Sequence, residues 1–246
     1  MLDAHVMISS DQDLENLDDD LSLSGVSQII ALCENLSDIG VGDLGDDGLV
    51  AAILPRAQFE SKQFRVQLDA CEHHSHVNGL WANLDDVSTQ GISFLTDLGF
   101  TLDVISRADE IRQVIELADL HPQLKFAWHC TGGLQADQAR NIRELARRPQ
   151  VYCKLSNLIL DAPGADCAVD KPLTESVREV FSILLENFTA ARLMYASGWG
   201  SGQRGMANVT YPAWLNTVDD LIHNLPADMR MAISSETAEE FYRLDL

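Results

Sequence analysis

The sequence predicts an α/β fold in which short apolar strands alternate with amphipathic helices and form a parallel sheet. Strand-like and helix-like runs alternate along all 246 residues, and this length suits one barrel of strand–helix units, which usually has ~250 residues. No linker rich in Pro, Gly or Ser and no internal repeat divides the chain, so we expect residues 1–246 to form one domain. An open doubly wound sheet is the alternative, but no glycine-rich phosphate-binding motif supports it.

The first half of the chain predicts four strands and two helices, and it is the more compressed half. Leu14, Leu17 and Leu21 recur at helical spacing after the first strand, and Gly25 ends that run. A stretch rich in acidic residues and Gly precedes the third strand and ends at Gly48. The expected strands cover residues 2–8, 27–32, 49–55 and 77–84, and a second helix covers 61–73.

The second half predicts four more strands, and here each strand is followed by a helical pattern. Ile111, Ile115 and Ala118 share one face of the first of these helices. The expected strands cover residues 100–105, 125–129, 151–156 and 192–197. The expected helices cover residues 108–120, 135–148, 174–188 and 211–225, with one more short helix over 237–244.

The charge balance excludes two classes of partner. The chain has 38 acidic and 17 basic residues, and the net charge of −21 repels nucleic acids and anionic membrane surfaces. Because the acidic residues are spread along the chain, solubility explains them better than a cationic partner does. The mean hydropathy is −0.05, no apolar run reaches the ~18 residues of a membrane span, and the N-terminus is acidic. These features favour a cytoplasmic protein.

The cysteines support the same compartment. Their number is odd and no CxxC spacing occurs, so we expect reduced thiols and neither disulfides nor a zinc site. The five residues are Cys33, Cys71, Cys130, Cys153 and Cys167.

Three motifs of the second half carry a resemblance to a known family. The runs VYCKLSNL (151–158), RLMYASGWG (192–200) and TAEEFYRL (237–244) together resemble the amidohydrolase-related lactonase family. That resemblance implies a (β/α)8 barrel, trimmed here in its N-terminal half. It also implies a hydrolase of lactones, amides and related bonds, since members of the family hydrolyse such bonds and some decarboxylate.

A barrel of this kind places its functional side chains at the carboxyl ends of the strands. The residues expected at these ends are His5, Asn83, Asp103, His129, Lys154, Ser156, Ser197 and Gly198. Under the family resemblance, His5 and His129 are candidate catalytic residues and candidate ligands of one divalent metal, zinc or manganese. The polar residues around them are candidates for binding the substrate.

The family's polar motifs are nevertheless incomplete in this chain. The second His of the first-strand motif is Met7, the Arg of the fourth strand is Trp81, and the Asp before the sixth-strand His is Trp128. The catalytic Asp of the eighth strand is Gly198, and the Asn that opens the closing motif is Thr237. These changes favour loss of the ancestral metal-assisted hydrolysis.

Two other groups of residues could supply chemistry. Lys154 lies two residues from Ser156 on one strand face, near Asp103, and could act as a base or form a Schiff base. The alternative, which we prefer, is that Lys154 is a framework residue. The histidine-rich run at 71–76 follows a helix and precedes a strand, which places it at the opposite, structural end of the barrel. There a helix-terminal His that interacts with the helix dipole is the favoured role, and a weak metal patch is the alternative.

Three tryptophans occur at or near predicted strand ends. Trp81, Trp128 and Trp199 would form an apolar mouth that suits a flat or cyclic ligand. The alternative is that they fill space left by the lost polar residues.

Three hypotheses about function follow. In the first, the chain hydrolyses a small cyclic ester or amide by water attack on a carbonyl group, with His5 and His129 at the reacting centre. In the second, the barrel has no activity and binds a small ligand or a partner protein through its Trp-lined mouth. In the third, Lys154 performs a different reaction on the same scaffold. The sequence leaves open whether the chain is an enzyme, because Gly198 occupies the catalytic position, and a homo-oligomer is compatible with it.

Overall fold

The computed structural model describes residues 1–10, 13, 16–17, 20–21, 24–38, 48–131, 134, 136–156, 158, 175–200 and 210–244. These residues contain two parallel sheets, ordered β1-β2-β3 and β4-β5-β6-β7-β8. The strands are β1 (Leu2–Met7), β2 (Gln28–Cys33), β3 (Val50–Pro55), β4 (Gly79–Asn83), β5 (Thr101–Arg107), β6 (Phe126–Thr131), β7 (Val151–Leu155) and β8 (Leu193–Tyr195). All eight expected strands are therefore present.

The two sheets join at β3 and β4 through isolated bridges. Ile53 pairs with Val77, and Arg56 pairs with Trp81, both in parallel. The backbone N–H of Ala57 donates to the carbonyl oxygen of Trp81 at 2.8 Å. This seam continues the parallel ladder from one sheet into the next.

A second seam joins the first strand to the last and closes the ring. Val6 pairs with Trp199, and the N–H of Met7 donates to the carbonyl oxygen of Trp199 at 2.8 Å. The N–H of Gly198 donates to the carbonyl oxygen of His5 at 3.0 Å. With both seams closed, the strands form the expected (β/α)8 barrel.

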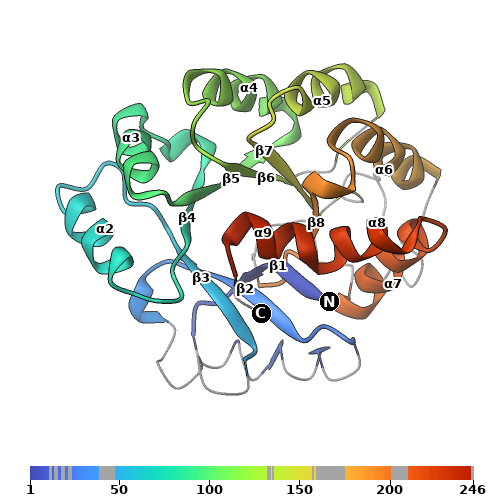
Figure 1. Ribbon diagram of the computed structural model, residues 1–246, viewed down its shortest axis with the longest axis horizontal. Helices are drawn as coiled ribbons and strands as arrows, with labels where there is room; N and C mark the ends of the chain where they lie inside the picture. The colour runs from blue at the N-terminus through green and yellow to red at the C-terminus, as the bar shows by residue number, and fades with distance from the viewer. Residues whose placement is uncertain are drawn as a thin grey trace.

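Helices surround the ring of strands (Figure 1). They are α2 (Phe64–Glu72), α3 (Thr89–Leu98), α4 (Ile111–Leu120), α5 (Ala139–Ala146), α6 (Glu175–Phe188), α7 (Tyr211–Ile222), α8 (Ala227–Met231) and α9 (Thr237–Tyr242). Between β2 and β3 the described residues form the 3-10 helix Leu36–Asp38, and residues 39–47 lie outside the described residues. Most of the helix expected after β1, including Leu14, lies outside the described residues.

Helix α3 is an element that the sequence did not predict. Its sequence contains Gly, Ser and Thr, which are weak helix formers, so local propensity gives little signal. The helix buries Ile92 and Leu95 against the barrel, and Gly91 lets the ring of Phe59 approach, because a side chain there would meet that ring at 2.1 Å. The helix ends at Gly99, whose positive φ of 72° terminates it in the left-handed region.

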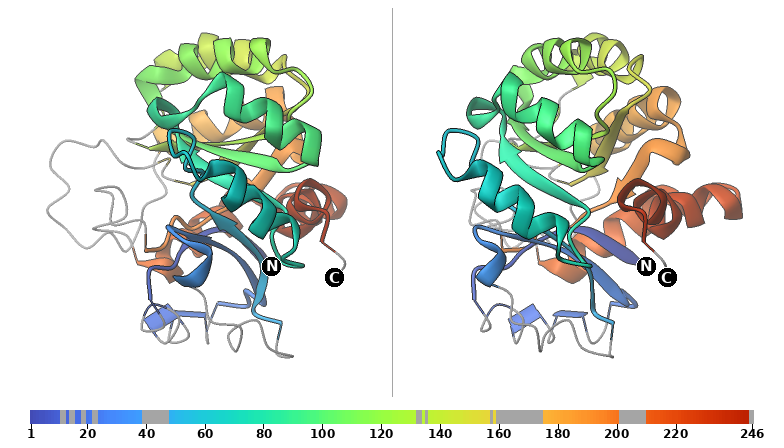
Figure 2. Two further views of the ribbon diagram at one scale, coloured as in Figure 1. Left: turned by 90° about the vertical axis from the view of Figure 1, so that its left-hand side faces the viewer. Right: turned by 60° about the vertical axis from the view of Figure 1, so that its left-hand side comes forward.

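Two apolar layers hold the barrel together. The larger layer lies between strands and outer helices, and the smaller one fills the barrel interior. Ala238, Phe241 and Tyr242 of α9 belong to the interior layer, so α9 closes the amino-terminal end of the barrel. Both termini lie at this end, beside α9 (Figure 2).

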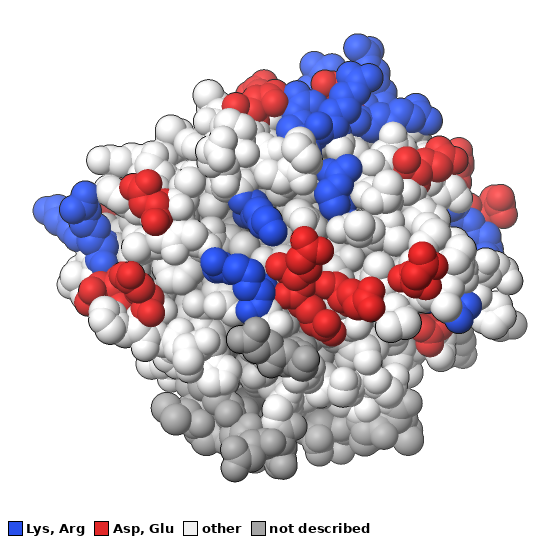
Figure 3. All heavy atoms as spheres, in the orientation of Figure 1, with Lys and Arg blue, Asp and Glu red and all other residues white. Residues whose placement is uncertain are grey.

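One face of the molecule shows how its charged side chains are distributed. On the face shown in Figure 3, acidic side chains form several separate groups, and basic side chains gather at the upper edge over α5. In the described part of the chain, no helix is long and apolar enough to cross a membrane.

The histidine-rich run lies where the sequence predicted. His73 is the C-cap residue of α2, and its Nδ1 lies 2.7 Å from the carbonyl oxygen of Asp69. That hydrogen bond raises the pKa of His73. The rings of His74 and His76 meet edge to face, with their centroids 6.0 Å apart. The run follows α2 and precedes β4, at the amino-terminal end of the barrel.

Candidate active site

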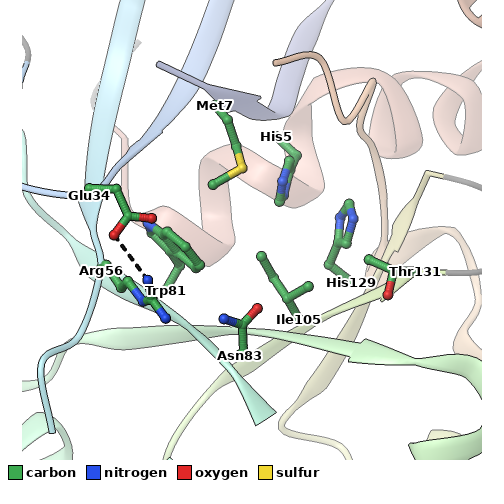
Figure 4. Close-up of a pocket in the computed structure, with 9 residues that line it drawn as sticks. All are labelled: His5, Met7, Glu34, Arg56, Trp81, Asn83, Ile105, His129 and Thr131. Atoms are coloured by element: carbon green, nitrogen blue, oxygen red, sulfur yellow. Dashed lines mark hydrogen bonds and ion pairs between the residues drawn. The ribbon is translucent and has the colours of Figure 1, made fainter. Parts of the chain in front are cut away.

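A cavity of about 160 Å³ opens at the carboxyl ends of the strands (Figure 4). Every residue that lines it lies on one of the strands β1 to β6 or directly after it. These residues are His5, Met7, Glu34, Arg56, Trp81, Asn83, Ile105, His129 and Thr131. The cavity therefore occupies the place where a barrel of this kind is expected to hold its ligand.

His5 and His129 meet inside this cavity, from β1 and β6. Their rings stack with centroids 3.9 Å apart and planes inclined by 25°. Both side chains are buried, at 0% and 1% exposure. His129 and Thr131 face inward together because strand residues alternate, whereas His5 and Met7 face inward because the register of β1 shifts between Asp3 and Val6.

Both imidazoles are neutral near pH 7. Burial, together with repulsion from His129 and Lys154, lowers the pKa of His5 well below its usual value. Burial and the charge of Lys154 lower the pKa of His129 to about 3. Nδ1 of His129 shares a hydrogen bond of 3.1 Å with Oγ of Ser156. Neither ring nitrogen of His5 has a hydrogen-bond partner among the described residues, so both can bond a polar group of a ligand.

Below the imidazoles, the barrel interior holds a buried ion pair. Nζ of Lys154 contacts a carboxylate oxygen of Asp103 and the carbonyl oxygen of Ala4. The hydroxyl of Tyr242, from α9, donates to Asp103 at 2.9 Å. Burial raises the pKa of Asp103 and lowers that of Lys154, while their contact opposes both shifts. None of these residues is among those lining the cavity, so their contacts are those of framework residues.

Sequence reasoning missed the two charged residues of the cavity, Glu34 and Arg56. Nη1 of Arg56 lies 3.1 Å from Glu34, and Nη2 lies 2.8 Å from Asp86. The guanidinium also lies over the indole of Trp81, 5.3 Å from the ring centroid. A signal was available, because Glu34 and Arg56 directly follow β2 and β3. Strand-end reasoning applied to these two strands would have found both.

The other predicted binding residues divide between the cavity and its surroundings. Asn83 lines the cavity and donates to Asp86 at 3.2 Å. Trp128 lies on the opposite face of β6 from His129, fully buried in the outer layer, where its indole N–H donates to Ser106 at 3.0 Å.

The residues from the end of β8 belong to the seam with β1. Oγ of Ser197 donates to the carbonyl oxygen of His5 at 3.3 Å. The indole N–H of Trp199 donates to Asp20 at 2.9 Å. Trp81 is therefore the one of the three expected indoles that the structure places on the cavity wall.

The donor set in the cavity does not suit a metal ion. A zinc site needs at least three nitrogen, oxygen or sulfur ligands around one point. Among the described residues, no group of three or more His, Cys, Asp or Glu side chains could hold a metal ion. The rings of His5 and His129 stack, so their lone pairs lie in two nearly parallel planes rather than in planes that meet at one point between the rings.

Comparison with known proteins identifies the family. A family profile described as amidohydrolase matches residues 43–244, which is most of the chain. The chain belongs to the amidohydrolase family. No curated protein matches this amidohydrolase.

Solved structures confirm the barrel over the whole length of this amidohydrolase. An amidohydrolase from Burkholderia multivorans with bound zinc is 18% identical, covers 99% of both chains and has a TM-score of 0.76. A Pseudomonas putida protein assigned as a 2-pyrone-4,6-dicarboxylic acid hydrolase is 18% identical, with coverage of 100% and 98% and a TM-score of 0.71. An Acinetobacter baumannii protein with the same assignment, with citric acid bound, is 12% identical, covers 99% of both chains and has a TM-score of 0.68. At these identities the likeness shows the fold alone.

The amidohydrolase barrel has two glycines with positive φ just after β8. Gly198, at the position where the family resemblance implies a catalytic Asp, has a positive φ of 71°. Gly200 also has a positive φ, and a side chain there would meet the carbonyl oxygen of Met7 at 2.2 Å. The two glycines let the chain pass close to β1 and leave no side chain at either position.

Proposed function

We propose that this amidohydrolase hydrolyses a small cyclic ester or amide in the cavity at the carboxyl ends of β1 to β6. The observation that carries the proposal is the buried pair His5 and His129, which presents two neutral imidazoles to one cavity. The family membership and the relatives assigned as lactone hydrolases support the same class of reaction.

Neutral imidazoles of low basicity are better suited to donate a hydrogen bond than to accept a proton. A group whose pKa is about 3 is a weak proton acceptor at neutral pH, whereas its N–H remains a good hydrogen-bond donor. An N–H aimed at the carbonyl oxygen stabilises the negative charge that develops there when water attacks. We assign this polarising role to His5 and His129.

The proton of the attacking water needs an acceptor. Glu34 is the carboxylate among the described residues that line the cavity, so we assign it the role of general base. Water attacks the carbonyl carbon, and its proton passes to Glu34. The carbon–oxygen or carbon–nitrogen bond of the ring then breaks, and the leaving atom takes the proton from Glu34. The product is the open-chain hydroxy acid or amino acid.

One observation favours a second candidate, a barrel that binds a ligand without turnover. Gly198 and Met7 stand where the family resemblance implies an Asp and a His, and the donor set does not suit a metal ion. A site that lost these groups would retain its cavity and lose its catalysis. Ligand binding without product formation would support this candidate.

The test is a hydrolysis screen of single-ring lactones and lactams, with metal content measured on the same samples. We expect turnover that a chelator leaves unchanged. We expect His129→Gln and His5→Gln each to lower kcat/KM by about 100-fold, which is typical for loss of one oxyanion donor. His223→Gln, at an exposed position after α7, is the matched control and keeps wild-type activity. Full activity of the His5→Gln and His129→Gln variants would exclude the proposed roles.

A pair of variants at Gly198 separates the two candidates. Asp and Asn tolerate positive φ better than other side chains and have similar shapes. If the barrel lost catalysis with its carboxylate, Gly198→Asp gains turnover over a silent wild type and Gly198→Asn does not. If the wild type hydrolyses lactones through Glu34, activity falls in Glu34→Gln and Gly198→Asp brings no gain over Gly198→Asn.

A further inference from the structure

Arg56 is held rigidly at the edge of the cavity by its backbone. Its N–H donates to the carbonyl oxygen of Cys33 at 2.9 Å, and its own carbonyl oxygen accepts from the side-chain amide of Gln67 at 2.6 Å. Its backbone also pairs with Trp81. These contacts fix the point from which the guanidinium extends, at the carboxyl end of β3.

The Arg56 side chain packs on an aromatic ring and forms ion pairs with two carboxylates. The indole of Trp81 lies under the guanidinium and is itself held by a hydrogen bond of 2.8 Å from its N–H to Cys33. Glu34 and Asp86 each contact a different terminal nitrogen of the guanidinium. Arg56 is the cationic residue among the described cavity-lining side chains, so it is the group on this wall with which an anionic ligand could pair.

Glu34 is the counter-ion that a ligand could replace. Its side chain is half-exposed, and a solvent-exposed ion pair of this kind contributes little to stability. Glu34 and Arg56 form part of the wall between the inner cavity and an outer groove of about 380 Å³. A released Glu34 carboxylate would therefore be hydrated in this groove. Asp86 would stay on Nη2 and keep the guanidinium oriented.

We propose that Arg56 recognises a carboxylate on the ligand, which takes the place of Glu34 on the guanidinium. The substrate class is then a single ring that carries a carboxylate, bound with its ring beside Trp81 and Ile105. The inference rests on the proposed function only in that both concern the same cavity.

The test measures binding without turnover, using benzoate and benzamide as the charged and neutral forms of one ring. By calorimetry, we expect the wild type to bind benzoate at least tenfold more tightly than benzamide. Arg56→Gln removes that preference, and Arg56→Lys keeps part of it, because Lys retains the charge but not the planar fork. Arg112→Gln, on the exposed face of α4, is the matched control and keeps the full preference.

Glu34→Gln distinguishes this proposal from the proposed hydrolysis. We expect this variant to bind benzoate more tightly than the wild type, because the ligand no longer competes with a resident carboxylate. The same variant loses turnover if Glu34 is the base. Equal affinity of the wild type for benzoate and benzamide would overturn the inference. So would a preference that survives in Arg56→Gln, or the absence of benzoate binding at millimolar concentration. Lack of lactone hydrolysis alone would affect only the proposed function.

Discussion

The carboxylate of Asp3 accepts the backbone N–H of Ser197 at 2.9 Å, which joins the first strand of the barrel to the end of the last. The same carboxylate accepts the N–H of His5 at 3.0 Å and the hydroxyl of Tyr211 at 3.0 Å. Asp3 is fully buried, so no water can replace it as an acceptor. Because β1 and β8 share no regular ladder, this side chain takes part of the role of backbone pairing at the seam.

Removal of the Asp3 carboxylate is expected to destabilise the barrel. Asp3→Ala leaves the buried N–H groups of His5 and Ser197 without an acceptor, which costs about 3 kcal/mol or more of unfolding free energy. Asp3→Asn keeps an amide oxygen for these donors and is expected to cost about 1 kcal/mol. Urea denaturation measures both. Equal losses for the two variants would show that the negative charge, and not the acceptor geometry, holds the seam.

The close approach of Gly200 to β1 gives a second prediction with a matched control. Gly200 and Gly25 have similar positive φ values, of 72° and 69°. A side chain at Gly200 would meet the Met7 carbonyl oxygen at 2.2 Å, whereas one at Gly25 meets nothing within 4 Å. Gly25→Ala therefore costs only the backbone strain of about 1–2 kcal/mol. Gly200→Ala is expected to lower the melting temperature further, and equal shifts would contradict the close approach.

The two buried imidazoles predict a loss of stability toward acid pH. Their pKa values are lower in the folded protein than the usual 6.5, so the unfolded chain binds more protons as the pH falls. Their contribution to stability is complete above pH 6.5 and decreases as the pH falls toward the folded value, about 3 for His129. Each imidazole adds a slope of up to about 1.4 kcal/mol per pH unit.

The pH prediction is tested by denaturation of the wild type and of His129→Gln between pH 7 and pH 5. Within this range most exposed carboxylates stay ionised, so the difference in slope reports the imidazole. We expect a smaller slope for His129→Gln than for the wild type. Parallel slopes for the two proteins would mean that His129 binds its proton in the folded state as readily as in the unfolded chain.

The strands could be predicted from the sequence because their apolar runs are short and bounded. The strand expected over 192–197 ends earlier, at Tyr195, because the next residues bond to side chains. The carbonyl oxygen of Ala196 accepts from the indole of Trp214, and the N–H of Ser197 donates to Asp3. The sequence near this strand does not indicate these side-chain partners, which come from distant parts of the chain. The same holds for α3, where the burial of Ile92 and Leu95 outweighs weak helix propensity.

The candidate site could be predicted only in part. His5, Asn83, His129 and Trp81 follow from their places at or near predicted strand ends and line the cavity. Trp128 is adjacent to His129 on β6, so the alternation that turns His129 inward turns Trp128 to the opposite face. Strand ends indicate Glu34 and Arg56, but the ion pairs of Arg56 with Glu34 and Asp86 join three strand ends and depend on the closure of the barrel. Cys167 lies outside the described residues, while the other four cysteines are free and buried, as expected for reduced thiols.

The ion pair between Lys154 and Asp103 allows a final prediction about a framework role. Lys154→Met leaves the buried Asp103 without its cation, and breaking such a pair costs about 3–5 kcal/mol. Adding Asp103→Asn removes the charge and keeps an acceptor for Tyr242, so we expect the double variant to be more stable than Lys154→Met alone. Denaturation of the single and double variants measures this coupling.

Borohydride trapping with a carbonyl ligand tests the alternative role of Lys154, which is to form a Schiff base. A trapped adduct on Lys154 would show that its amine reaches the ligand, in conflict with its contacts to Asp103 and Ala4. Without an adduct, recovery in the double variant would assign Lys154 to the barrel's internal support and leave the chemistry to the groups above it.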